Sequence, residues 1–202
     1  MAGGFARLQK VDPMESESEL HSCQVTVGSV LGAMAYHTGG VLVDLGWLKI
    51  LGARSNGCPW SISRLTENLG WSRGEDPPSA VAVGLDILGG VFAINGGGIA
   101  SESLGNVFYF DPSCLRWEDL RVPHSQWLAS MLEPPRVAKF YADMRWAGCE
   151  NEAKTLRPEQ GISVAPPLFT AESRPLERAS RRPVPLDELV RLNFDMARQV
   201  SR

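Results

Sequence analysis

The alternation of apolar and polar residues through the middle of the chain predicts β-strands. In residues 106–110, Phe108 and Phe110 fall on one face and Val107 and Tyr109 on the other, which is the period of two of a strand. Apolar runs also predict extended segments at residues 41–44, 47–51, 80–83, 91–94 and 115–120. Because short turns join most of these segments, we expect a mostly antiparallel or mixed, twisted sheet of five or more strands.

Apolar residues spaced by three and four predict helices around these strands. Ser29 is a suitable N-cap for one short helix, and the spacing of Ile62, Leu65 and Leu69 predicts a second short helix, closed by Gly70. The same spacing predicts three later helices, at residues 125–132, 135–144 and 185–200. The fold class is therefore α+β, with helices packed on one face of the sheet and a helix at the C-terminus.

Five glycines lie in the segment DILGGVFAINGGG, residues 86–98, and raise the question of a phosphate-binding loop. A dinucleotide fingerprint needs a third glycine at position 101, where the chain has Ser101, and a P-loop needs a lysine that the segment lacks. Glycine also supplies the positive φ angles of a tight reversal between strands. We therefore predict a β-hairpin here.

The first 20 residues end in a polar run with three glutamates, Glu15, Glu17 and Glu19. Such a run offers little apolar surface, so residues 1–20 are expected to form a flexible acidic tail and residues 21–202 a single α+β domain. No secretory signal and no apolar run long enough to span a bilayer is evident, so a cytoplasmic protein without membrane contact is expected.

The charge and the cysteine content limit which binding partners and metal sites we expect. The chain has 20 Lys and Arg against 23 Asp and Glu, a net charge of −3, which argues against nucleic acid as a partner. Its four cysteines lie far apart without a C-x-x-C pair, which argues against a thiolate zinc site and suggests free thiols. We expect no cofactor and no metal, and the sequence gives no oligomeric state.

The polar residues near the predicted turns do not form a recognisable catalytic motif. Asp86, Asn95 and Asp111 are better explained as turn residues that bond their own backbone than as ligands of a calcium ion. Glu118 and Asp119 are adjacent in a predicted strand, so their side chains should point to opposite faces rather than act as a catalytic pair. No catalytic residue is predicted.

Exposed aromatic and acidic residues are the remaining candidates for function. Trp60 and Trp71 flank a short helix in a loop-rich region, where they serve either as core residues or as anchors for a partner. Together with Glu118 and Asp119 they are the predicted partner contacts.

Several stretches, in order, resemble a bacterial family, domain of unknown function 2625. They are TGGVLVDLGWLKILG, LGGVFAINGG, GNVFYFDPSCLRWEDL, KFYADMRWAG and SRRPVPLDEL. The chain departs from the family pattern at Leu45, Ser113 and Arg116. The order of elements is also similar, more distantly, to the SUKH superfamily, a resemblance that implies toxin immunity or regulation.

Two functions are open at this point. The first is a protein-binding, regulatory module of the toxin-immunity kind, motivated by the lack of a catalytic motif and by the SUKH resemblance. The second is a small hydrolase with a carboxylate-based site near the glycine-rich hairpin. The second requires Asp86, Asn95 and Asp111 to converge in one deep pocket.

Overall fold

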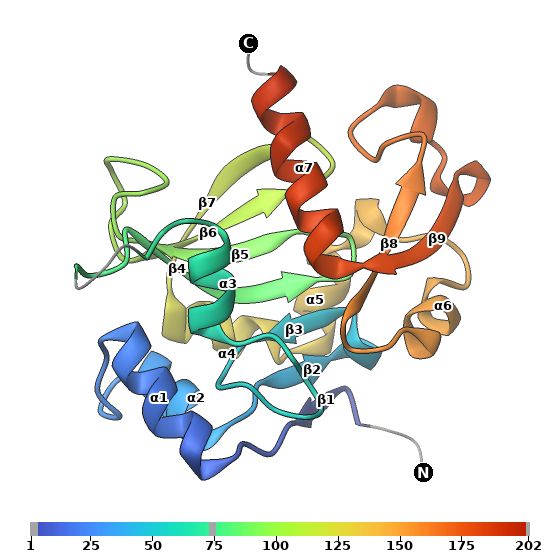
Figure 1. Ribbon diagram of the computed structural model, residues 1–202. Helices are drawn as coiled ribbons and strands as arrows, with labels where there is room; N and C mark the ends of the chain where they lie inside the picture. The colour runs from blue at the N-terminus through green and yellow to red at the C-terminus, as the bar shows by residue number, and fades with distance from the viewer. Residues whose placement is uncertain (1–3, 73–75, 201–202) are drawn as a thin grey trace.

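A seven-stranded antiparallel sheet forms the centre of the protein in a computed structural model, which describes residues 4–72 and 76–200 (Figure 1). Each strand pairs with its neighbours in chain order, from β1 at one edge to β7 at the other. The strands are β1 (Ala6–Leu8), β2 (Val41–Val43), β3 (Leu48–Ile50), β4 (Ala80–Asp86), β5 (Val91–Asn95), β6 (Asn106–Asp111) and β7 (Arg116–Pro123). The predicted α+β class is confirmed.

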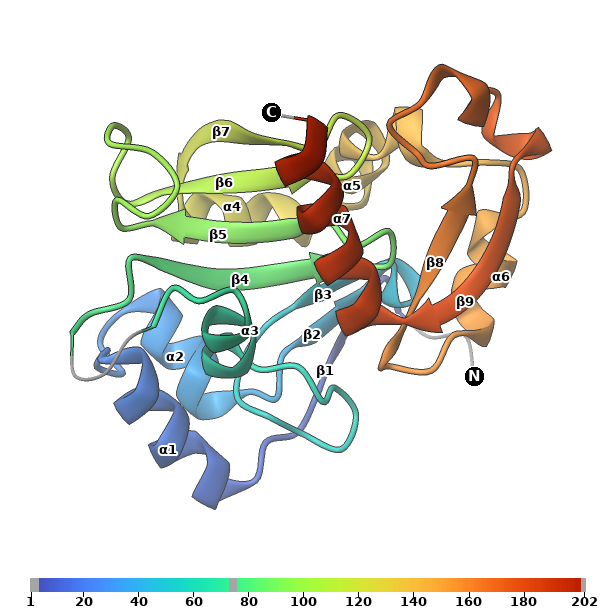
Figure 2. The same cartoon turned by 45° about the horizontal axis from the view of Figure 1, so that its top comes forward.

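Helices cover both faces of this sheet. The helices are α1 (Pro13–Cys23), α2 (Val30–His37), α3 (Ile62–Asn68), α4 (His124–Met131), α5 (Pro134–Phe140), α6 (Cys149–Thr155) and α7 (Leu186–Val200), with 3-10 turns at Asp44–Gly46, Ala142–Met144, Ala171–Ser173 and Leu176–Arg178. In Figure 2, α4 and α5 lie behind the sheet while α3 and α7 lie in front of it. None of the described residues belongs to a helix that is long and apolar enough to cross a membrane.

The alternation of strand side chains produces two apolar cores. On the face beneath α4 and α5, the ring of Phe92 lies 4.5 Å from that of Tyr109 and 5.1 Å from that of Trp127. On the other face, Phe110 stacks on Phe194 of α7, with ring centroids 4.3 Å apart. Neighbouring residues of β6 thus serve opposite cores, as its period of two predicts.

The glycine-rich segment is the β4–β5 hairpin, as predicted. Asp86 Oδ1 accepts hydrogen bonds from the backbone N–H groups of Leu88 and Gly90, both at 2.9 Å, and Gly89 has a φ of 80°. These bonds close the turn from within. Gly84 does not end β4, contrary to the predicted boundary at residue 83, but lies inside the strand next to a register shift.

The N-terminal segment is ordered in the described residues from position 4, so the predicted tail over residues 1–20 is wrong there; residues 1–3 lie outside the described part. Residues 6–8 pair with β2, and α1 begins at the N-cap Asp12. Glu19 is buried and accepts two bonds from Ser63, from the backbone N–H at 2.6 Å and from the hydroxyl at 2.8 Å. Acidic side chains of this segment therefore form hydrogen bonds inside the fold, which the composition of the segment does not reveal.

The segment before α7 also departs from expectation. It contains α6 and a second, two-stranded antiparallel sheet of β8 (Gln160–Ala165) and β9 (Ser180–Pro185), none of which is among the elements predicted from the sequence. The β8–β9 hairpin joins the main body through the Ile162 N–H, which donates to the Ile87 carbonyl at 2.6 Å. Prolines are tolerated in β9 because a two-stranded sheet leaves one side of each strand unpaired.

Candidate functional site

A groove between α3 and α7 is the best-formed site that includes a predicted contact residue. It encloses a cavity of about 320 Å³, and its apolar surface comes from both helices and the loop before α3: Trp60, Leu65, Leu69, Val190 and Phe194. Its polar lining comprises Asn68, Asp187, Arg191, Asp195 and Arg198. An apolar floor with a charged rim is typical of sites that bind other molecules.

Trp60 is held in place by the start of α3. Ser61 caps this helix through its hydroxyl, which accepts a bond from the Arg64 N–H at 3.2 Å. The Arg64 guanidinium lies 5.3 Å from the Trp60 ring centroid and donates to the Pro59 carbonyl at 3.0 Å. Trp60 is only 3% exposed, so it is a wall of the groove rather than a projecting anchor.

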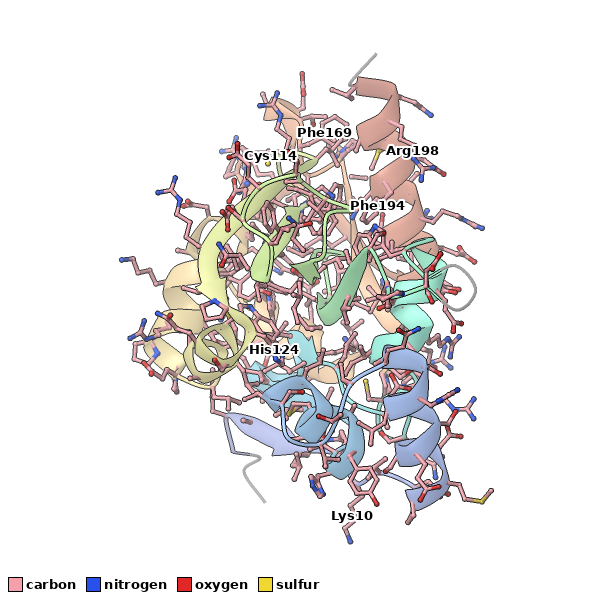
Figure 3. The ribbon with its side chains drawn as sticks, turned by 90° about the vertical axis from the view of Figure 1, so that its left-hand side faces the viewer. Lys10, Cys114, His124, Phe169, Phe194 and Arg198 are labelled. Carbon is pink, nitrogen blue, oxygen red and sulfur yellow. The ribbon has the colours of Figure 1, made fainter. Side chains whose placement is uncertain are left out.

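Helix α7 supplies most of the rim. Asp195 and Arg198 pair with each other at 3.0 Å, whereas Asp187 and Arg191 form no ion pair with any described residue. Phe194 and Arg198 both project from this helix (Figure 3). The rim therefore offers one unpaired charge of each sign, one helical turn apart.

Trp71 lies outside the groove but joins it through other aromatic rings. Its ring centroid is 5.6 Å from that of Trp117 on β7, which is in turn 6.0 Å from that of Phe194. Trp71 and Trp117 are both half-buried. Trp71 therefore approaches the groove that Trp60 lines only through the rings of Trp117 and Phe194.

The two acidic candidates do not line the groove, and their side chains point away from each other. Glu118 pairs in register with Tyr109 and Asp119 with Phe108, so their side chains point to opposite faces of β7, as predicted. Asp119 accepts hydrogen bonds from the Arg121 N–H at 2.7 Å and from Asn106 Nδ2 at 3.3 Å. The four predicted contacts do not form one site.

The polar residues on which a hydrolase would depend do not converge. Asn95 pairs with Ala80 at one end of the β4–β5 hairpin, whereas Asp86 lies at its other end. Asn95 Oδ1 accepts a hydrogen bond from the backbone N–H of Gly97 in the following loop. Asp111 Oδ1 accepts a hydrogen bond from the Ser113 N–H at 2.6 Å. Each side chain closes its own turn, so the structure offers no support for the carboxylate-based site.

Asp86 is fully buried in a hydrogen-bond network. Its Oδ2 accepts from the Tyr109 hydroxyl at 2.8 Å and from the Tyr141 hydroxyl at 3.3 Å, in addition to the two backbone bonds to Oδ1. Burial raises the pKa of Asp86, and the bonds from Tyr109 and the backbone oppose that rise. Burial and the nearby Asp86 raise the pKa of both tyrosines well above 10.

Lys49 is a second buried charge, on the opposite face of the sheet. It is 2% exposed, and its Nζ donates to the Gly46 carbonyl at 3.3 Å. Burial lowers its pKa to about 8, opposed by the neighbouring Cys58 and Asp86. Lys49 borders none of the described cavities, so we expect its substitution to change the stability of the fold rather than binding.

Three residues near the β6–β7 turn have the spacing to hold a metal ion. One ligand atom from each of Asp111, Cys114 and Glu118 lies within 4.8 Å of the other two. Cys114 and Glu118 are exposed, and exposed groups of this kind are common without a metal. No other feature of the described residues points to an ion here.

Sequence reasoning missed the contribution of α7 to the groove. An apolar stripe on α7 was expected, but Phe194 and the rim charges were not recognised. Pairing α7 with α3 depends on tertiary structure, because more than a hundred residues separate the two helices. The sequence signal was the row of charges beside the apolar stripe of α7.

Comparison with known proteins gives a family match over most of the chain. A family model described as "Protein of unknown function DUF2625" matches residues 3–189. An uncharacterized protein of Haemophilus influenzae is 29% identical over 185 residues, which are 92% of this chain and 80% of that protein. The putative uncharacterized protein YbfG of Escherichia coli (strain K12) is 30% identical over 197 residues, 96% and 86% of the two chains.

No solved structure matches the chain. The more distant resemblance to the SUKH superfamily finds no support in these comparisons and stays a prediction.

Proposed function

This chain belongs to the DUF2625 family of proteins of unknown function, and from that premise we propose that it is a protein-binding module whose α3/α7 groove holds a short segment of another protein. One apolar side chain of that segment occupies the cavity. A basic residue of the segment faces Asp187 and an acidic residue faces Arg191.

The observation that carries this proposal is the unpaired charge of each sign beside an apolar floor. A small apolar solute would leave Asp187 and Arg191 without partners, whereas a peptide supplies both charges next to its anchor. The cavity of about 320 Å³ has room for one large side chain, which suits a single anchor. A toxin-neutralising role would be one case of such binding.

Filling the groove is expected to abolish peptide binding. Asn68 is exposed at the end of α3 and lines the groove, so Asn68→Trp should occupy the cavity without disturbing the core. Peptides selected from a random library on the whole protein should lose at least about tenfold in affinity, measured by calorimetry. They should also carry an aromatic or large aliphatic residue with charges of both signs nearby.

The matched control is Asn151→Trp, because Asn151 is also exposed, lies on α6 and lines no described cavity. It should leave the affinity unchanged. Arg191→Glu should weaken the selected peptides, whereas Arg182→Glu, on β9 and outside the groove, should not. Selected peptides that bind both tryptophan variants as well as the unmodified protein would refute the groove as the site.

A further inference from the structure

The first strand of the sheet leaves one side of its backbone unpaired. β1 forms one edge of the seven-stranded sheet, and β2 is its one neighbour among the described strands (Figure 1). The Phe5 carbonyl and the Gln9 N–H both hydrogen-bond to the chain around β2, so residues 5, 7 and 9 direct their backbone groups toward β2. The N–H and C=O groups of Ala6 and Leu8 therefore point outward from the sheet.

A broad groove runs along this unpaired side. Its cavity measures about 1070 Å³ and lies between the segment that contains β1 and the loop that precedes α3. Residues 7–13 line it without interruption, whereas a groove over one face of a strand would be lined by alternate residues. We call it the β1 edge groove; its lining consists of residues 7–13 and 15 on one side and residues 54–57, 59 and 64 on the other.

The β1 edge groove is basic, although the chain has a net charge of −3. Four basic side chains line it, against the two carboxylates of Asp12 and Glu15. Both carboxylates are engaged within the fold, because Asp12 caps α1 and Glu15 pairs with Arg54 at 2.5 Å. Arg7 and Lys10 form no ion pair with any described residue. Two unpaired positive charges therefore lie beside the unpaired backbone.

We propose that the β1 edge groove binds an extended, acidic segment of another protein, which adds to the sheet as a further strand beside β1. The backbone of the segment pairs with Ala6 and Leu8, which is the pattern of strand addition to an exposed sheet edge. Carboxylates of the segment lie beside Arg7 and Lys10. An apolar side chain of the segment lies beside Leu8, which is 63% exposed.

Charge and backbone geometry favour this occupant over two others. A second copy of the chain, paired through β1 about a two-fold axis centred on the strand, would set the Arg7 side chains of the two copies against each other, and like charges directly opposite are destabilising. A nucleic acid would meet the positive charges, but it has no peptide groups to pair with Ala6 and Leu8. The β1 edge groove shares no lining residue with the α3/α7 groove, so this proposal does not rest on the function proposed above.

Strand addition can be tested on the unmodified protein with two capped peptides of alternating glutamate and valine, each as long as residues 5–10. The first has an ordinary backbone. In the second every backbone nitrogen is methylated, which keeps the carboxylates and removes the N–H donors. The first peptide should bind at least about tenfold more tightly in a titration followed by NMR, because it alone can form the strand hydrogen bonds.

Hydrogen exchange reports the same contact residue by residue. When the first peptide binds, the amide protons of Ala6 and Leu8 should exchange more slowly with solvent, whereas that of Arg7, which already faces β2, should change little. Equal affinity for the two peptides, or no saturable shift with the first, would overturn the proposal.

Two pairs of variants test the place of binding. Leu8→Pro removes an outward N–H group, and an edge strand tolerates proline where the N–H faces solvent, so the fold should persist while affinity for the first peptide falls about tenfold. Leu8→Val keeps this N–H group and should retain the affinity. Arg7→Glu should also cost about tenfold. Its control is Arg116→Glu, because Arg116 is exposed on β7, at the opposite edge of the sheet, and lines no described cavity.

Four results would refute strand addition at β1. The first is an unchanged affinity of both Leu8→Pro and Arg7→Glu for the first peptide. Tighter binding of single-stranded oligothymidylate than of this peptide would assign the basic residues to nucleic acid. Dimers that form with increasing concentration and that Leu8→Pro abolishes, measured by sedimentation, would assign the edge to a second copy. Loss of the peptide in Asn68→Trp would place it in the α3/α7 groove instead.

Discussion

Replacing Lys49 by methionine is expected to raise the free energy of unfolding at pH 7 by about 3 kcal/mol. Lys49 is buried with one carbonyl as its hydrogen-bond partner, and burial lowers its pKa from 10.5 to about 8. Each unit of difference between the folded and unfolded pKa corresponds to about 1.4 kcal/mol. Methionine has a similar length and carries no charge to desolvate.

The pH dependence of the unfolding free energy should show the same cost of burying the Lys49 charge. Because folding lowers the pKa of Lys49, the unfolded chain binds more protons between pH of about 8 and 10.5. Stability of the unmodified protein should therefore rise relative to Lys49→Met as pH increases through this window, so the two curves converge.

Urea denaturation of both proteins at several pH values measures this difference. Lys139→Met is the control, because Lys139 is exposed on α5 and its loss should change stability little at any of these pH values. A gap between the unmodified protein and Lys49→Met that stays constant up to pH 10.5 would contradict a buried, destabilising ammonium group.

Replacing Asp86 by alanine is expected to cost about 4 kcal/mol of unfolding free energy. The substitution leaves two backbone N–H groups and two tyrosine hydroxyls without their acceptor in the core. Each such loss typically costs about 1 to 3 kcal/mol, and the tyrosines can recover part of it by rotation of their hydroxyls. The turn at Gly89 would also lose the bonds that close it.

The substitution Asp86→Asn distinguishes the contribution of the turn hydrogen bonds from that of the tyrosine hydrogen bonds. Asparagine keeps one oxygen for the Leu88 and Gly90 N–H groups, while its amide nitrogen faces hydroxyls that can accept, so a smaller loss than for Asp86→Ala is expected. Asp119→Ala serves as the control, since it removes two hydrogen bonds at a site open to water. If denaturation shows equal losses for Asp86→Ala and Asp119→Ala, the buried network does not stabilise the core as described.

Much of the sheet could be predicted because the relevant signals are local. The period of two in residues 106–110 defines β6 and divides its side chains between the two cores. Asp86 and Gly89 specify the hairpin turn through a side-chain bond and a positive φ angle that neighbouring residues reveal. The N-cap Ser29 likewise fixes the start of α2.

The elements that were missed depend on distant contacts. Helix α1 is polar, and its buried Glu19 is satisfied by Ser63, 44 positions away. The two strands of the β8–β9 hairpin are separated by residues 166–179, which hide their pairing from a local reading. The α3/α7 groove has the same origin: Trp60 was identifiable as a candidate, but its neighbours on α7 were not.

The chain-order pairing of the seven strands also bears on how the protein folds. Apart from β3 and β4, which residues 51–79 separate, adjacent strands from β2 to β7 are close in sequence, so these pairs can form at a small entropic cost of loop closure. Asn193, in contrast, reaches back 104 residues to Gly89. We therefore expect amide protons of β4 to β6 to gain protection early in refolding, and those of α7 to gain it last.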